Sequence, residues 1–236
     1  MEEKFEKLKN LMATEGLTCN DVIGYCKAKQ DEEKLIQERK AARRQKIAEF
    51  FPPNDVRSKA LLYDYAFEGG KFASNHDAYP NCQGVVGWIN PDPNAPEGER
   101  VYVVLPELNC LKYSTEDYCT GANDLYDGRA NTKTLLENGR EWWGNFPAAE
   151  YAYNYAKNGV KQGEAFLPAR GQLRRIVENA DGLREALKKI DGKFEGMLMS
   201  SSEDSRTCAW FVDFINGNVQ SGNKRYHASF SCIIAY

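Results

Sequence analysis

The segment near the C-terminus collects polar side chains that are suited to binding. It reads NGNVQSGNKRYHASF over residues 216–230. Tyr and Arg are typical anchors of binding surfaces, while Ser, Gly and Asn supply adaptable hydrogen bonds. An ordinary polar hairpin loop is the alternative that residue types leave open. We predict a ligand-binding surface over residues 220–229, made of Gln220, Ser221, Gly222, Asn223, Arg225, Tyr226, His227, Ala228 and Ser229.

Other chemically capable residues form no recognisable catalytic set. His227 has no nucleophile motif beside it, and Ser200–Ser202 lacks the G-x-S-x-G turn of hydrolases. Asp117, Asp124 and Asp127 could bind a cation through oxygen ligands, but their spacing matches no EF-hand loop, so we favour a structural loop. We therefore expect no catalytic residue, no metal and no cofactor, and leave open whether a cation binds the loop 117–127.

Two further groups of residues have a packing interpretation. Trp142 and Trp143 could stack on a sugar or a base, but we expect buried packing. The 7 cysteines include no CxxC pair and the chain has only 2 histidines, so a zinc site is not expected. We expect most of the thiols to be reduced, as in a reducing cytoplasm, and leave open whether one disulfide forms.

Composition excludes several classes of protein. The chain has 236 residues, of which 42% are hydrophobic and 28% charged, with a net charge of −3. This balance is typical of a soluble globular protein, and it argues against nucleic acid as the main partner because such domains usually carry a strong basic excess. No apolar run approaches the roughly 20 residues that a bilayer requires, so no membrane span is expected. The N-terminus shows no secretory signal.

Composition changes sharply near Phe51, and residues 1–52 are expected to form a helical N-terminal segment. Apolar spacing predicts a helix over residues 2–13. A second helix is predicted to open with the capping residues Thr18–Asp21 and to end at Pro52–Pro53.

The apolar stripe of this N-terminal segment is thin. We therefore expect it to dock on the rest of the chain or to form a homo-oligomer through residues 1–50. Its basic run over residues 38–46 could be a nucleic-acid patch, but acidic neighbours favour a solvated helix face.

Residues 53–236 mix strand and helix patterns. Two early strands are predicted on either side of a proline-rich turn, and a polar loop is predicted over residues 112–131. Two helices and two strands follow, with Asn216–Gly217 as a hairpin turn between strands. The strand alternation predicts that Trp210, Phe214, Cys232 and Ile234 are buried. The expected helices and strands are 83–89, 100–105, 147–157, 170–190, 208–214 and 230–236.

Five motifs in this region carry a resemblance to a known family. They read DGRAN, FPAAEYA, FLPARGQL, SSSE and AWFVDFING, in that order. Their order and spacing resemble a large bacterial and phage family of C-type-lectin-like domains, over about residues 80–236. Met199 stands where that family usually has Trp, and Gln172 where it usually has Glu. The resemblance implies an α+β, C-type-lectin-like fold behind the N-terminal helical segment, with a ligand-binding domain over residues 53–236.

The C-terminal tail resembles the variable region of proteins that are diversified by retroelements. Such regions keep an N-G-N-V start and a Lys between runs of Asn codons, whose adenines are randomised. Asn216–Val219 and Lys224 fit this frame, whereas Gln220 and Phe230–Ser231 depart from it. The resemblance implies a variable region over about residues 206–231.

The resemblance implies a binding protein rather than an enzyme. It would present the patch at 220–229 to a protein or glycan on another cell or particle, as in receptor recognition by a phage tail tip or in bacterial surface display. The lack of a visible signal sequence favours a phage virion or a cytoplasmic pool. The alternatives are a structural phage tail or pilus component without a variable site, and a formylglycine-generating-type oxidase. Cys208 and Cys232 have apolar neighbours of the same strand parity, which indicates inert thiols rather than those of such an oxidase.

Overall fold

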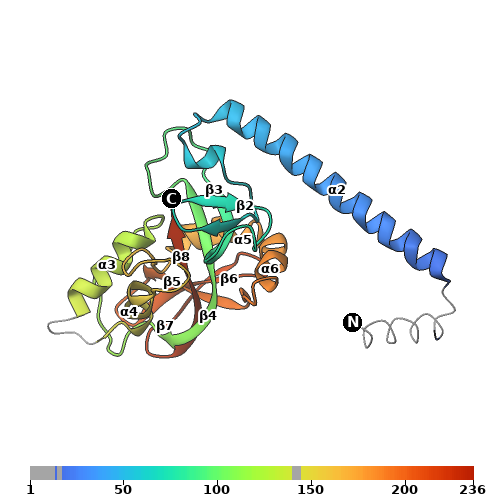
Figure 1. The fold of residues 1–236 in the computed structure, drawn as a ribbon. Helices are drawn as coiled ribbons and strands as arrows, with labels where there is room; N and C mark the ends of the chain where they lie inside the picture. The colour runs from blue at the N-terminus through green and yellow to red at the C-terminus, as the bar shows by residue number, and fades with distance from the viewer. Residues whose placement is uncertain (1–13, 15–17, 140–144) are drawn as a thin grey trace. The chain divides into compact units, whose positions relative to one another are not determined.

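The computed structural model describes residue 14, residues 18–139 and residues 145–236 (Figure 1). The helix expected over residues 2–13 and the pair Trp142–Trp143 lie outside the described residues. The chain divides into two compact units, Met1–Ile47 and Ala48–Tyr236. Across the residues described here, no helix has both the length and the apolar character needed to cross a membrane.

The long helix α2, Cys19–Phe50, begins where the capping pattern predicts. The backbone N–H and the hydroxyl of Thr18 both donate to the Asp21 carboxylate, at 2.7 and 2.6 Å. The Asp21 N–H donates back to the Thr18 hydroxyl oxygen at 3.2 Å. This reciprocal pair satisfies two of the amide donors that a helix start leaves open.

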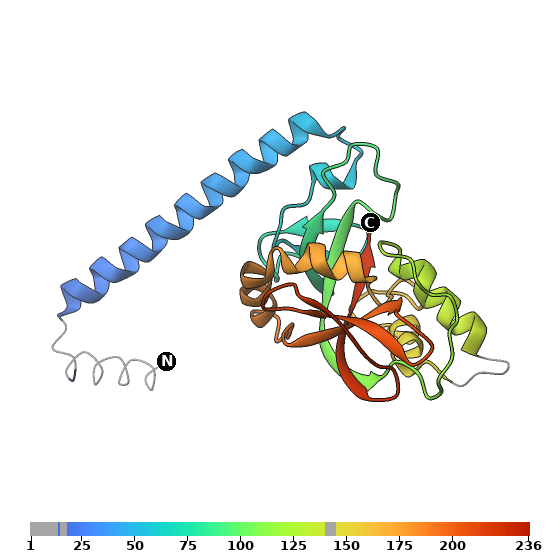
Figure 2. The ribbon, with the colours of Figure 1, turned by 180° about the vertical axis from the view of Figure 1, so that it is seen from behind.

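The second unit is a mixed α+β structure built on one sheet of 8 strands. Their order is β2-β1-β3-β4-β8-β5-β6-β7, so the C-terminal strand lies inside the sheet (Figure 2). All neighbouring strands are antiparallel apart from β5 and β8, which run parallel. The strands are β1 Tyr65–Phe67, β2 Lys71–Ala73, β3 Cys82–Ile89, β4 Val101–Lys112, β5 Met197–Glu203, β6 Cys208–Asp213, β7 Val219–Asn223 and β8 His227–Ala235.

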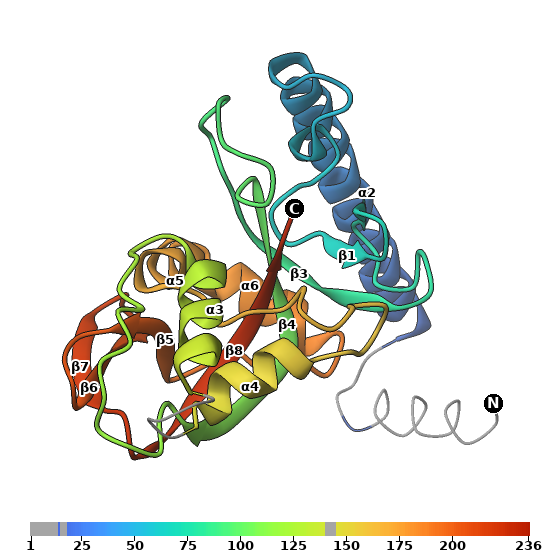
Figure 3. The same ribbon diagram turned by 90° about the vertical axis from the view of Figure 1, so that its left-hand side faces the viewer.

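Helices cover both faces of this sheet (Figure 3). On one face, α3 (Gly128–Gly139) and α4 (Pro147–Asn154) pack on a cluster that includes Val103 and Phe230. On the other face, α5 (Arg170–Val177) and α6 (Ala180–Lys188) pack on a cluster that includes Val104 and Ile233. The alternation of Val103 and Val104 between the two clusters follows from the two-residue period of a strand.

Burial along β6 differs from the predicted alternation. Phe214, Cys232 and Ile234 are buried as predicted, but Trp210 is only half-buried. Ala209 and Phe211 belong to one apolar cluster, whereas Val212 and Phe214 belong to the other. Because both faces of the sheet are covered, no single parity of β6 is the buried one. The Arg170 guanidinium lies over the Trp210 ring, 4.6 Å from the ring centre.

Two other elements differ from the predictions. Residues 128–131 are the start of α3 rather than loop, because the Asp127 carboxylate accepts the Ala130 N–H at 2.8 Å and caps the helix. The single helix predicted over residues 170–190 is two helices, α5 and α6. They are separated at Asn179, whose side-chain amide donates to the Gly87 carbonyl at 3.3 Å. Asn residues compete for backbone hydrogen bonds and so interrupt helices.

Candidate functional site

The predicted binding residues lie on β7, on the turn after it and at the start of β8. Within the described residues β7 pairs with β6 alone and forms an edge of the sheet. The surface is not uniformly exposed, which corrects the prediction for residues 220–229. Gln220, Ser221, Arg225, Tyr226 and His227 are exposed; Gly222, Asn223, Ala228 and Ser229 are half-buried, and Lys224 is fully buried.

The tip consists of Arg225 and Tyr226 in the turn and of His227, the first residue of β8. Tyr226 is 73% exposed, and the Arg225 guanidinium lies 3.7 Å from the Asp117 carboxylate. The turn closes on itself, because Asn223 accepts the Arg225 N–H on its side-chain oxygen at 2.8 Å. The tip therefore offers a phenol, a guanidinium and an imidazole to solvent from a short, closed turn.

The base of the turn is a buried ion pair. The Lys224 ammonium donates to Glu203 Oε1 at 2.6 Å and to the Tyr118 carbonyl at 2.8 Å. The same ammonium lies 5.5 Å from the centre of the Tyr113 ring. Burial, followed by the nearby Glu203 charge, raises the pKa of Tyr113, so this phenol stays neutral below the Lys224 ammonium.

The second oxygen of Glu203 ties the ion pair to the loop that follows β4. It accepts the N–H groups of Thr120 and Gly121 at 2.8 and 2.9 Å and the Thr120 hydroxyl at 3.0 Å. Glu203 is the last residue of β5, so one carboxylate connects β5, this loop and the turn after β7. A buried charge with this many hydrogen bonds holds its neighbours in a fixed geometry.

Three predicted residues of β7 have defined neighbours. The Ser221 hydroxyl donates to Asp204 at 2.6 Å, and the Gln220 amide donates to the Met197 sulfur at 3.4 Å. A Cβ atom at Gly222 would lie 2.6 Å from the Phe211 ring. A side chain at residue 222 would therefore force the Phe211 ring to move, and a ligand contact at Gly222 stays a prediction.

The first two half-buried residues of β8 face the far end of β4. Ala228 pairs with Leu111, and Ser229 pairs with Cys110. Ser229 also faces Leu198 of β5. The structure brings Ala228 and Ser229 close to the turn but places them within the sheet rather than on its tip.

The aspartates of the loop 117–127 act as hydrogen-bond acceptors. Asp124 Oδ1 accepts the N–H groups of Tyr126 and Asp127, both at 2.7 Å. Asp127 caps α3, and Asp117 faces Arg225. Among the residues that the structure describes, no group of three or more His, Cys, Asp or Glu side chains could hold a metal ion.

The two strand cysteines differ in their surroundings. Cys232 is buried in the cluster under α3 and α4, and burial raises the pKa of its thiol. Cys208 is half-buried, and a hydrogen bond with the Thr207 hydroxyl lowers the pKa of its thiol, so the inert character expected for this thiol stays a prediction. Ala209 of β6 belongs to the same apolar cluster as Cys232, so these two residues lie on the same face of the sheet. Cys208 comes directly before Ala209 in β6, so it lies on the other face. The strand β5 also separates β6 from β8. The two sulfurs therefore lie on opposite faces of the sheet and cannot act as a pair.

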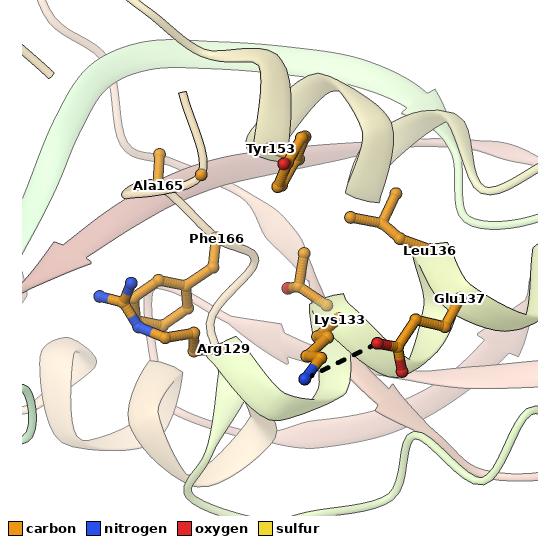
Figure 4. Close-up of a pocket in the computed structure, with 9 residues that line it drawn as sticks. Arg129, Lys133, Leu136, Glu137, Tyr153, Ala165 and Phe166 are labelled. Carbon is orange, nitrogen blue, oxygen red and sulfur yellow. Dashed lines mark ion pairs between the residues drawn. The ribbon is translucent and has the colours of Figure 1, made fainter. Parts of the chain in front are cut away.

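A pocket that sequence reasoning missed lies between α3, α4 and the segment 163–166 (Figure 4). It encloses about 390 Å³. The Arg129 guanidinium lies 4.8 Å from the centre of the Phe166 ring, and Lys133 faces Glu137 at 3.7 Å. The helical spacing of Arg129, Lys133 and Glu137 was the available signal, but it is also typical of an ordinary exposed helix face. The lining is mostly apolar, with the guanidinium at one side (Figure 4).

Comparison with known proteins identifies a fold relative rather than a family. No family model matches this chain, and no curated protein matches it. Among solved structures, the chain is similar to a fimbrial protein from Bacteroides ovatus, with a TM-score of 0.56 and 12% sequence identity. The match covers 75% of this chain and 49% of that protein, so the chain spans about half the length of its neighbour. The two proteins share a fold.

Proposed function

We propose that this chain is a ligand-binding protein that displays a diversified surface on the turn between β7 and β8. The observation that supports the proposal is the division of this turn at Lys224. The buried ion pair of Lys224 with Glu203 fixes the backbone at this residue. The three residues that follow it, Arg225, Tyr226 and His227, face solvent. Side chains on such a tip can change without disturbing the core, because they take no part in it.

The chemistry of the tip suits a protein or glycan on another cell or particle. Tyr226 offers a rigid ring that can pack on a sugar face or an apolar side chain. Arg225 offers a guanidinium that pairs with carboxylates. These two residues would provide the anchors of the interface, with Ser221 and His227 supplying hydrogen bonds beside them.

Diversification of this turn makes a prediction about the neighbouring DNA. We expect a reverse transcriptase gene and a near-copy of the terminal coding segment that differs only at adenines. The structure sharpens this expectation for two codons. Lys224 should be invariant among diversified copies and residue 222 should stay Gly, because only these residues fit the buried base and the Phe211 contact. Copies that change Lys224 as freely as Tyr226 would contradict the proposal.

A binding assay tests the display surface directly. Labelled protein is incubated with a panel of bacterial cells and a glycan array, and bound protein is measured by fluorescence. We expect the triple variant Arg225→Ala/Tyr226→Ala/His227→Ala to lose binding. Tyr153→Ala is the matched control, because Tyr153 is 39% exposed and lines the pocket beside α3 rather than the turn, so its loss should leave binding unchanged. Binding that survives the triple change would refute the role of the turn.

A structural pilus component is the second candidate, and the fold shared with the fimbrial protein favours it. A filament subunit would be recovered in sheared surface filaments whether or not the turn carries its native residues. Electron microscopy of sheared fractions from cells that express the triple variant separates the two functions. Filaments that contain this chain would favour the structural role, particularly if the triple variant assembled as well as the wild type.

A further inference from the structure

The helix α2 has apolar side chains on its surface. Of its described side chains only Val22 and Lys40 are half-buried, and the others are exposed. Ile36 is 43% exposed and Phe50 is 68% exposed. A polar helix with so few apolar contacts is marginally stable alone in water, so a partner surface would stabilise it.

One row of residues along α2 has the spacing of a coiled-coil seam. Positions separated alternately by four and three residues share one side of a helix and meet a partner helix. Five of the nine residues in this row are apolar and four are charged. The row is Val22, Cys26, Lys29, Glu33, Ile36, Lys40, Arg43, Ile47 and Phe50.

The charges in this row distinguish between the two orientations of a pair of helices. In a parallel pair each residue meets its own copy, so Lys29, Glu33, Lys40 and Arg43 would form four layers of like charge. In an antiparallel pair centred on Ile36, each Glu33 meets the partner's Lys40. The apolar ends also match, because Val22 then meets the partner's Phe50. Like charges facing each other destabilise a pair, so this row favours the antiparallel orientation.

Residues beside the row favour the same orientation. Glu32 and Arg39 share one flank, and the antiparallel register places each Glu32 against the partner's Arg39. One layer of like charge remains, Lys29 against the partner's Arg43. Glu32 already accepts a hydrogen bond from the Lys29 ammonium at 3.2 Å, which offsets part of that repulsion.

We propose that two copies of this chain associate through α2 as an antiparallel pair with Ile36 at its centre. The interface is isologous, since every contact occurs twice around the two-fold axis. At a rise of 1.5 Å per residue, the two Phe50 residues lie about 42 Å apart along the axis. Each copy contributes its own turn between β7 and β8, so, resting on the function proposed above, one dimer carries two display turns and can bind two ligands.

Charge reversal tests this register in the full-length chain, with mass measured by sedimentation equilibrium. The wild type should be a dimer. Glu33→Lys and Lys40→Glu, each alone, should raise the dissociation constant about tenfold, because each turns two attractive contacts into repulsive ones. The double variant should restore the wild-type value. Glu38→Lys is the matched control, because it makes the same change of charge on the opposite side of the helix.

Two outcomes would overturn the proposal in this assay. A monomeric wild type would refute the pairing itself. An equal weakening by Glu38→Lys and Glu33→Lys would show that net charge acts rather than the register.

The native Cys26 provides an independent test of orientation. In a parallel pair Cys26 meets its own copy, whereas in the antiparallel pair it lies opposite the partner's Ile47. After mild oxidation we expect equal amounts of disulfide-linked dimer from the wild type and from Cys26→Ser. A cross-linked dimer that Cys26→Ser removes would show the parallel orientation and overturn the proposal.

Discussion

The base and the tip of the turn between β7 and β8 contain neighbouring cationic residues with opposite surroundings. Lys224 is fully buried and paired with Glu203 at 2.6 Å. Arg225 is exposed and lies 3.7 Å from a partly exposed Asp117. A buried pair becomes costly when one partner is lost, whereas an exposed pair contributes little. Of these two consecutive residues, Lys224 therefore has a structural role, whereas Arg225 is available to bind a ligand.

The largest effect is expected at the base. Lys224→Ala should destabilise the fold by about 3–5 kcal/mol, because it leaves the Glu203 carboxylate buried without its cation. Urea unfolding followed by circular dichroism measures the change. The double variant Lys224→Met/Glu203→Gln should lose less than Lys224→Ala, since no buried charge is left unpaired. If Lys224→Ala changed stability no more than an exposed substitution does, the turn would not be anchored by this pair.

The strand β6, which pairs with β7, and the residue that follows β6 provide the next comparison. Phe214 is fully buried, so Phe214→Ala should cost about 3–5 kcal/mol through the cavity it creates. Trp210 is half-buried with Arg170 above it, so Trp210→Ala should cost about 1–2 kcal/mol, within the ordinary range of single substitutions. Thermal unfolding of both variants checks the order. If Trp210→Ala lost more stability than Phe214→Ala, Trp210 would behave as a core residue, as the sequence alternation of β6 predicts.

Local sequence signals predicted much of the secondary structure. The capping residues of α2, the strands β3, β6 and β8, and the Pro-Ala-Ala start of α4 depend on residues close together in the chain, so patterns reveal them. The order of the sheet depends on pairing between distant strands, such as β4 with β8, which no local pattern contains. The apolar alternation along β6 predicted the burial of Trp210 incorrectly, because helices cover both faces of the sheet and neither face is the single buried one.

In the candidate site, too, local features could be predicted from the sequence, whereas features that depend on distant residues could not. The exposure of Arg225, Tyr226 and His227 follows from their polar types and from the turn. The burial of Lys224 depends on Glu203 and on the Tyr118 carbonyl, which are distant in the sequence. The restriction at Gly222 likewise depends on the Phe211 ring of the neighbouring strand.

A smaller effect is expected within β7, between the base and the open edge. Gly222→Ala should cost about 1–3 kcal/mol, because the new methyl group would meet the Phe211 ring and force it to move. Ser221→Ala on the neighbouring residue is the control, since Ser221 is exposed and its side chain can shrink without a clash. Urea unfolding of both variants measures the difference. Equal stability of the two variants would mean that β7 accepts diversity at residue 222 after all.

The smallest effect is expected at the tip. The triple change Arg225→Ala/Tyr226→Ala/His227→Ala should alter stability by about 0.5 kcal/mol or less at each site, because all three side chains are exposed. The ion pair of Arg225 with Asp117 adds little to this, since both partners are partly in solvent and 3.7 Å apart. The melting temperature of the triple variant, measured beside Lys224→Ala, tests the comparison directly. A triple variant that melts as early as Lys224→Ala would show that the tip supports the fold, and the turn could not then serve as a surface that varies independently of the core.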